Sequence, residues 1–187
     1  MKKNFITFKI LIITGIIIIS YACNNTEKAW KNAQADNTLE AYMEFLDNHP
    51  DSEFSGDAER KIELLVWENA ISGARIVDYE GYIEQYPDGV FVNNAARIID
   101  SLRFYEVDNI CTIEAYNGFL NNFPQNRYTD TIRSRIIDLE WENAQHDNSI
   151  SAYQDFLNNY PGNKYEQAAI GQIEKIKTEN QNNLQKI

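Results

Sequence analysis

The sequence predicts an all-helical protein built from repeated pairs of helices. It contains only four prolines, each 37 residues after the last: Pro50, Pro87, Pro124 and Pro161. Aromatic residues recur at the same interval, and two of these series are Trp30, Trp67, Phe104 and Trp141, and Tyr42, Tyr79, Tyr116 and Tyr153. No insertion or deletion interrupts the four copies. A fixed period of this length is typical of solenoids, in which stacked copies bury a core that one copy alone would leave exposed.

The first helix of each pair is expected to be short. Its apolar residues follow the three-and-four spacing of an amphipathic helix, which in the first copy gives Leu39, Tyr42, Phe45 and Leu46. We expect the helix to be capped at Asn37, with Glu40 three residues later, and at Asn148–Ser149 in the fourth copy. It should end near the proline, because the residue before a proline disfavours helical geometry.

A longer helix is expected to follow each proline. Two residues past the prolines stand Ser52, Gly89, Asn126 and Asn163. Serine and asparagine accept hydrogen bonds from the free amides of a helix start, so we expect long helices to begin near residues 53, 90, 127 and 164. In the first copy Leu65 and Trp67 fall on different sides of this helix. We therefore expect it to be buried between its own partner and the short helix of the next copy.

The N-terminus has the layout of a secretion signal over residues 1–22. Lys2, Lys3 and Lys9 form a basic start, and residues 10–19 are almost uninterruptedly apolar. This run is about half of the ~20 residues that a membrane-spanning helix needs. The following Ser20-Tyr21-Ala22-Cys23 resembles the lipobox of bacterial lipoproteins. The resemblance implies cleavage before Cys23 and lipidation of its thiol; an ordinary signal peptide with a chance cysteine is the alternative.

The charge of the chain limits its partners. The formal net charge is -11, and removal of residues 1–22 takes away three lysines and no acidic residue. The remaining 14 basic and 28 acidic residues give a net charge of -14. Such a surface repels nucleic acid and favours solubility and basic partners. We expect no nucleic-acid partner.

The sequence offers little catalytic or metal-binding chemistry. With Cys23 lipidated, Cys111 stands alone, and we expect it to be a small buried hydrophobic residue. We call positions that are 37 residues apart, or a multiple of 37 apart, a slot. Of the two histidines, His49 lies in a slot that aromatic residues fill in the other copies, and His146 lies in a predicted turn. We interpret His49 as a packing residue, since zinc sites need three or four converging ligands. We expect no metal, no cofactor and no enzymatic activity.

Two glycines and two arginines within the repeated helices allow more than one interpretation. Gly81 and Gly118 share a slot with Glu44 and Asp155, so either close packing or simple tolerance would account for them. Arg60 and Arg97 share an outward slot of the long helices. They are weak candidates for a polar, partner-binding groove, with a solvated surface as the alternative.

The repeated phrase "A…DN-x-x-EAY-x-x-FL-x-x-YP-x-S/N-x-Y-x-x-x-A" resembles the tetratricopeptide repeat over about residues 26–177. More narrowly, it is similar to the variant in the tetratricopeptide lipoprotein of the β-barrel assembly machinery. The resemblance implies a solenoid over residues 23–187. Its units would be a truncated start at about 26–50, then 51–87, 88–124 and 125–161, and a capping helix at 162–187.

The resemblance also implies a general function. We expect a lipid-anchored scaffold for protein–protein interactions in the bacterial cell envelope, in the outer membrane and within an assembly or transport complex. Its partner would be a protein or peptide bound through residues that differ between copies. The alternative is an envelope protein that binds a glycan or a small ligand.

Overall fold

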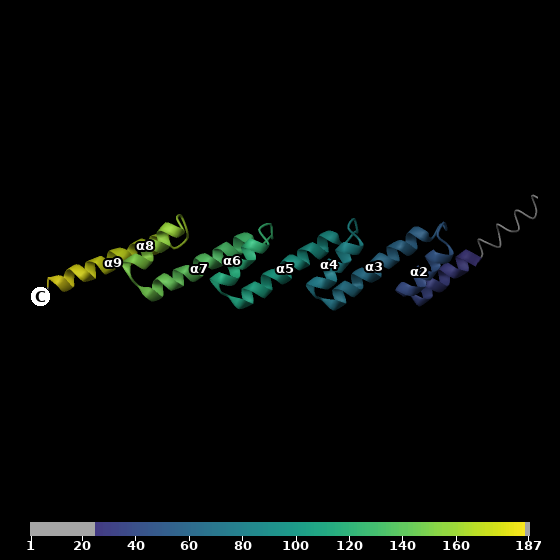
Figure 1. Cartoon of the computed structure of the whole chain (residues 1–187), viewed down its shortest axis with the longest axis horizontal. Coiled ribbons are helices and arrows are strands. Elements are labelled where there is room, and N and C mark those ends of the chain that lie inside the picture. The colour runs from purple at the N-terminus through teal and green to yellow at the C-terminus, as the bar shows by residue number, and fades with distance from the viewer. Residues whose placement is uncertain (1–24, 186–187) are drawn as a thin grey trace, which may run out of the picture. The chain divides into compact units, whose positions relative to one another are not determined.

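The computed structural model describes residues 25–185, and these residues are almost entirely α-helical (Figure 1). No strand occurs within this range, so the predicted all-helical class is confirmed for it. The predicted signal sequence and Cys23 lie outside the described residues, and their assignment stays a prediction.

Short and long helices alternate along the chain. A helical segment over residues 25–36 comes first. The ten-residue helices are α2 (Leu39–Asn48), α4 (Ile76–Gln85), α6 (Ile113–Asn122) and α8 (Ile150–Asn159). The nineteen-residue helices are α3 (Ser55–Gly73), α5 (Val92–Ile110), α7 (Thr129–Asp147) and α9 (Glu166–Leu184). We call each such helix pair a hairpin. The first hairpin is the segment 25–36 with α2, the second is α3 with α4, the third is α5 with α6, and the fourth is α7 with α8.

The chain divides into two compact units, Met1–Ile98 and Ile99–Ile187, with the boundary inside α5. In the first unit α3 packs against both α2 and α4, and in the second α7 packs against both α6 and α8. Leu65 of α3 contacts the core of the first hairpin, whereas Trp67 contacts Tyr79 and Tyr82 of α4. The predicted two-sided burial of this long helix is therefore confirmed.

Recurring aromatic residues make up the cores of the hairpins. Tyr42, Tyr79, Tyr116 and Tyr153 are 1%, 5%, 0% and 2% exposed, which confirms that they are core residues. The segment 25–36 and the helices α3, α5 and α7 each place an aromatic ring against the ring that precedes the next long helix. The stacked pairs are Trp30–Phe54, Trp67–Phe91, Phe104–Tyr128 and Trp141–Tyr165. Such a pair contributes about 0.5–1.5 kcal/mol beyond the surface that it buries.

The short helices end before the prolines, as predicted, but the predicted start of α2 needs a correction. The N-cap of α2 is Thr38, whose hydroxyl accepts a hydrogen bond from the N–H of Ala41 at 3.2 Å. Asn37, predicted to be this cap, instead adopts a left-handed conformation one residue earlier. Ser149 caps α8 in the predicted way, through the N–H of Ala152.

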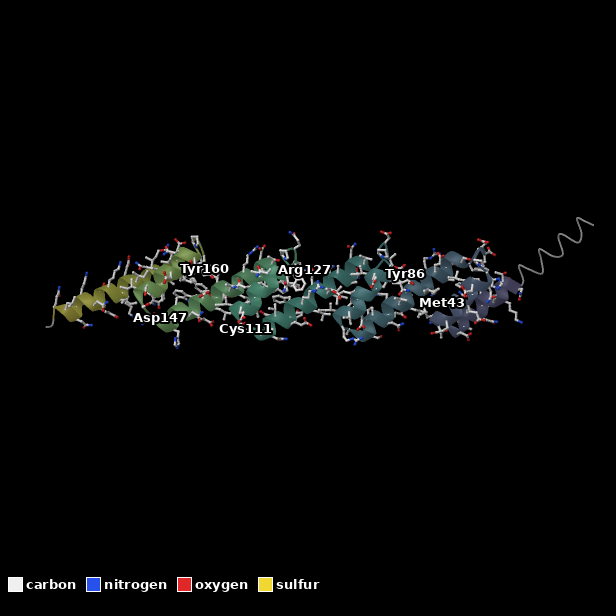
Figure 2. All side chains as sticks on the ribbon, in the orientation of Figure 1. Met43, Tyr86, Cys111, Arg127, Asp147 and Tyr160 are labelled. Atoms are coloured by element: carbon white, nitrogen blue, oxygen red, sulfur yellow. The ribbon has the colours of Figure 1, made fainter. Side chains whose placement is uncertain are left out.

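One residue after the segment 25–36, and one residue after each of α3, α5 and α7, the backbone turns left-handed. These residues are Asn37 (φ 47°), Ala74 (φ 54°), Cys111 (φ 53°) and Asn148 (φ 51°). Cys111 is exposed, so the prediction that it is a buried hydrophobic residue is wrong (Figure 2). The reason is positional, because a residue that ends a helix in this conformation lies at the end of the hairpin and not within its core.

The long helices begin about two residues later than predicted. Ser52, Asn126 and Asn163 do accept the N–H of the residue two positions on, but they close a turn before the helix. Gly89 has no side chain that could accept such a hydrogen bond. Two other residues accept the backbone N–H groups of this turn: the Glu63 carboxylate accepts the N–H of Val90 at 2.8 Å, and the Tyr82 hydroxyl accepts the N–H of Phe91 at 3.1 Å.

Candidate functional site

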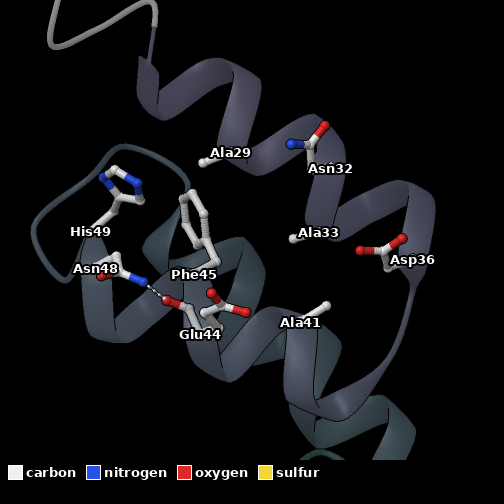
Figure 3. Close-up of a pocket in the computed structure, with 9 residues that line it drawn as sticks. All are labelled: Ala29, Asn32, Ala33, Asp36, Ala41, Glu44, Phe45, Asn48 and His49. Carbon is white, nitrogen blue, oxygen red and sulfur yellow. Dashed lines mark hydrogen bonds between the residues drawn. The ribbon is translucent and has the colours of Figure 1, made fainter.

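A groove of about 250 Å³ lies between the helical segment 25–36 and α2 (Figure 3). We call it the first groove. It is lined by Ala29, Asn32, Ala33, Asp36, Ala41, Glu44, Phe45, Asn48 and His49. The small side chains on the two facing helices leave room between them, and the groove is open because no larger residue fills that room.

The first groove has a small apolar floor and a larger polar rim. Ala33 and Phe45 form part of the floor and are 4% and 3% exposed. Asp36 and Glu44 are exposed on the rim, on opposite helices. Figure 3 shows Phe45 pointing from α2 toward the segment 25–36, with the Asp36 carboxylate beyond Ala33.

His49 closes one end of the first groove. Its ring lies 5.2 Å from the ring of Phe45, which confirms that it is a packing residue. Its Nδ1 atom also lies 3.3 Å from the hydroxyl of Thr26. These two contacts place the ring at the wall of the groove.

A second groove, of about 230 Å³, lies between α7 and α8. Its lining residues are Glu140, Asn143, Ala144, Asp147, Ala152, Asp155, Phe156, Asn159 and Tyr160. Every one of them stands 111 residues, or three periods, after a lining residue of the first groove. The two compact units therefore carry grooves built from corresponding positions; Figure 2 labels Asp147 and Tyr160 of the second.

The ionisable side chains of the second groove are mostly carboxylates. Glu140, Asp147 and Asp155 line it together with the ring of Tyr160. Burial raises the pKa of the Tyr160 phenol above its usual range, and the negative charge of nearby Glu140 raises it further. The phenol therefore stays protonated and neutral near pH 7. Carboxylates beside an aromatic floor suit a ligand that is both cationic and partly apolar.

The corresponding place in the third hairpin is occupied by the chain's own Arg103. The guanidinium carbon of Arg103 lies 4.4 Å from the centre of the Phe123 ring, a cation–π contact. Arg103 stands at the position of Ala29 in the first groove, and Phe123 stands at the position of His49. In the third hairpin an arginine side chain thus lies on the ring that corresponds to His49 of the first groove.

The rim position of Glu44 and Asp155 is acidic only in the first and fourth hairpins. The slot of Glu44 and Asp155 holds Gly81 and Gly118 in the other two hairpins. A Cβ atom at either glycine would meet nothing within 4 Å. Close packing therefore does not explain these two glycines. The position tolerates glycine, because no neighbour requires the side chain to be absent.

Arg60 and Arg97, the arginines suggested by the sequence, line neither groove. Arg60 is exposed on α3 and forms an ion pair with Asp57 of the same helix. Arg97 is exposed on α5. The polar groove proposed for them stays untested. Asp36, Glu44, Asp147 and Asp155 were not recognised from the sequence, because carboxylates on helices are usually solvated. The available signal was a repeat position that holds an acid in two copies, Glu44 and Asp155, and glycine in the other two.

Among residues 25–185, no three histidine, cysteine, aspartate or glutamate side chains are placed to hold a metal ion. Of the helices within that range, none is long and apolar enough to cross a membrane. No protein-family model matches the chain, and neither does any curated protein.

Proposed function

We propose that this chain is a lipid-anchored, tetratricopeptide-like solenoid of four 37-residue repeats that serves as a scaffold for protein–protein interactions. The alternation of ten- and nineteen-residue helices supports the repeat. The basic start, the apolar run and Cys23 support export and lipidation. On this proposal the protein lies in the bacterial envelope, at the outer membrane, within an assembly or transport complex.

One observation carries the scaffold proposal: the side chains that recur are buried, and those that differ between copies are exposed. The recurring tyrosines are at most 5% exposed. Met43, Ile71 and Val77, large apolar residues of the first unit, are 51%, 47% and 61% exposed, and polar residues fill most of the corresponding positions in other copies. A regular interior with a varied surface is how repeat proteins present a binding face.

The test is photo-crosslinking in living cells. A photoreactive amino acid replaces Asn48 or Asn159 at the grooves, or Met43 on the apolar surface. Matched controls carry it at Glu179 and Asn182, exposed residues near the end of α9. We expect one protein partner to be captured in stoichiometric amount from the first set and not from the controls.

Two other outcomes would overturn the proposal. Equal capture from all positions would indicate random encounters. Retention of the protein on peptidoglycan or polysaccharide, without any crosslinked protein, would favour the glycan-binding alternative.

The anchor has its own test. Cys23→Ala should abolish labelling with a fatty-acid probe and release the protein from the membrane fraction. Lipid labelling that persists in this variant would show that the lipobox assignment is wrong.

A further inference from the structure

We propose that each groove binds the side chain of an arginine or lysine residue from the protein partner. This inference rests on the scaffold function proposed above and gives the chemistry of the partner segment. The occupant must be long enough to lie along the apolar floor and must carry a positive charge at the rim.

The first argument is the pairing of floor and rim. In the first groove the Phe45 ring and three alanines provide a small apolar floor, with Asp36 and Glu44 at the more extensive polar rim. In the second groove Phe156 and two alanines provide the floor, with Glu140, Asp147 and Asp155 around it. The methylene stem of a basic side chain packs on apolar surface while its charged end stays at the edge. Displacing water from such a groove strengthens the attraction between the carboxylates and a cation.

The second argument comes from the third hairpin, where the chain provides its own occupant. Arg103 lies on the Phe123 ring, with its guanidinium carbon 4.4 Å from the ring centre. The corresponding rings in the grooves are His49 and Tyr160, and both line them. An arginine from a partner would lie where Arg103 lies, on a ring that packs beside the phenylalanine of the floor.

The third argument is the placement of the acids at the rims of the two grooves. The slot of Asp36 and Asp147 holds Gly73 and Ile110 in the second and third hairpins. The slot of Glu44 and Asp155 holds Gly81 and Gly118. These two slots are acidic only in the first and fourth hairpins. The second and third hairpins carry their acids at other positions, Asp78 in the slot of Ala41 and Glu106 in the slot of Asn32.

The experiment measures peptide binding by the full-length chain in non-ionic detergent, at about 150 mM salt so that diffuse charge effects are screened. The probes are fluorescein-labelled, end-blocked peptides of Ala and Gly with arginine, lysine, glutamine or glutamate at every third position. Fluorescence anisotropy gives the affinities. We expect the arginine and lysine peptides to bind at least about tenfold more tightly than the glutamine peptide.

Two quadruple variants of equal net charge separate the grooves from the rest of the acidic surface. The groove variant is Asp36→Asn, Glu44→Gln, Asp147→Asn, Asp155→Asn. The control is Glu59→Gln, Glu68→Gln, Glu142→Gln, Glu179→Gln, at exposed positions outside both grooves. We expect the groove variant to lose about tenfold or more in affinity for the arginine peptide and the control to lose about twofold or less. Circular dichroism confirms that both variants are folded.

A further pair of variants uses the arginine of the third hairpin as a guide. In a background with Asp147→Asn and Asp155→Asn, Ala29→Arg places an arginine where Arg103 stands in its own hairpin. Gln34→Arg adds the same charge at an exposed position of the same helical segment, outside the groove. We expect Ala29→Arg to compete with the peptide and weaken its binding more than Gln34→Arg does.

The outcomes distinguish this inference from the scaffold proposal. If the groove and control variants lose affinity equally, the acidic surface as a whole attracts the peptide and the inference is wrong. If no basic peptide binds more tightly than the glutamine peptide, the inference is also wrong. In either case a partner captured by crosslinking in cells would still support the scaffold, through a different surface.

Discussion

The Glu63 carboxylate lies in the space that a side chain on Gly89 would need. A Cβ atom built on Gly89 would be 2.6 Å from Glu63 Oε1. The same oxygen accepts hydrogen bonds from the Tyr82 hydroxyl at 2.6 Å and from the N–H of Val90 at 2.8 Å. The second hairpin thus closes its turn with a carboxylate from α3, and the glycine gives that carboxylate access to the backbone.

Gly89→Asn should destabilise the first unit, although asparagine stands at the corresponding positions 126 and 163. The new side chain meets Glu63 and Tyr82, and overpacking of this kind costs about 1–3 kcal/mol. Urea unfolding and faster hydrogen exchange at the amides of Val90 and Phe91 would measure the loss.

A paired variant provides the control for this prediction. In the third hairpin Asn126 Nδ2 donates to the shorter carboxylate of Asp100 at 2.8 Å, and Asp100 stands at the position of Glu63. Glu63→Asp combined with Gly89→Asn should therefore recover part of the stability. A double variant less stable than Gly89→Asn alone would contradict the steric explanation.

Ala74→Asn should stabilise the first unit. Ala74 has φ 54°, a left-handed conformation that costs an ordinary L-residue about 1–2 kcal/mol and that asparagine tolerates better. At the corresponding positions, Asn37 and Asn148 also accept hydrogen bonds from the hydroxyls of Tyr42 and Tyr153, both at 3.1 Å. The asparagine introduced by Ala74→Asn would meet Tyr79 in the same way and add about 0.5–1.5 kcal/mol.

Two comparisons separate the backbone effect from the hydrogen bond. Ala74→Gly relieves the strained backbone without offering an acceptor, so it should raise the urea midpoint less than Ala74→Asn. In a Tyr79→Phe background the advantage of asparagine over glycine should shrink. An unchanged advantage would mean that no such hydrogen bond forms.

The first unit should lose stability in strongly alkaline solution because of Tyr82. Burial, and then the hydrogen bond to Glu63, raise the pKa of Tyr82 to about 12 from the ordinary value of 10.0. The folded protein thus holds the phenol proton more tightly than the unfolded chain does. The stabilisation is complete below about pH 10 and is lost as the pH rises to about 12.

Tyr82→Phe provides the comparison for this pH dependence. The variant should be less stable than the parent at pH 8, since the hydrogen bonds of the hydroxyl are gone. Its urea midpoint should fall less steeply between about pH 10 and pH 12, where Tyr82 titrates in the parent. Parallel curves for the two proteins would show that another group controls the alkaline loss.

Arg103→Ala should destabilise the second unit moderately and expose one face of the Phe123 ring. A cation–π contact near the surface contributes about 0.5–1 kcal/mol, and the methylene stem of Arg103 adds packing. Arg103→Lys keeps the charge but loses the flat guanidinium, so its effect should be intermediate. Arg133→Ala, at an exposed arginine of α7 paired with Asp130, should change stability by less than about 0.5 kcal/mol. Equal effects for Arg103→Ala and Arg133→Ala in urea unfolding would rule out a contribution from the ring contact.

Much of the fold was predictable because helix ends and helix faces leave strong signals in the sequence. The prolines marked the ends of the short helices, and the spacing of Leu65 and Trp67 predicted burial on two sides of α3. The errors came from residues with more than one local use. Asn126 can cap a helix or close a turn, and Cys111 can fill a core or end a helix in a left-handed conformation. Neither choice is decided by the residue alone.

The candidate site was less predictable, since a groove depends on what is missing from the space between two helices. Ala29 and Arg103 occupy one slot of the period, yet the first leaves a groove open and the second fills it. Sequence position alone gives no volume. The rim acids Glu44 and Asp155 were visible only as a departure from Gly81 and Gly118, and such a departure has no meaning until the groove beneath it is known.

The stacked aromatic pairs have a consequence for how the chain reaches its native state. Each pair, from Trp30–Phe54 to Trp141–Tyr165, joins residues that are 24 positions apart. Contacts this local close with little loss of chain entropy and favour rapid folding. A chain that emerges N-terminus first can complete one such pair before the next aromatic residues have appeared. Folding in this order does not require the two ends of the protein to meet.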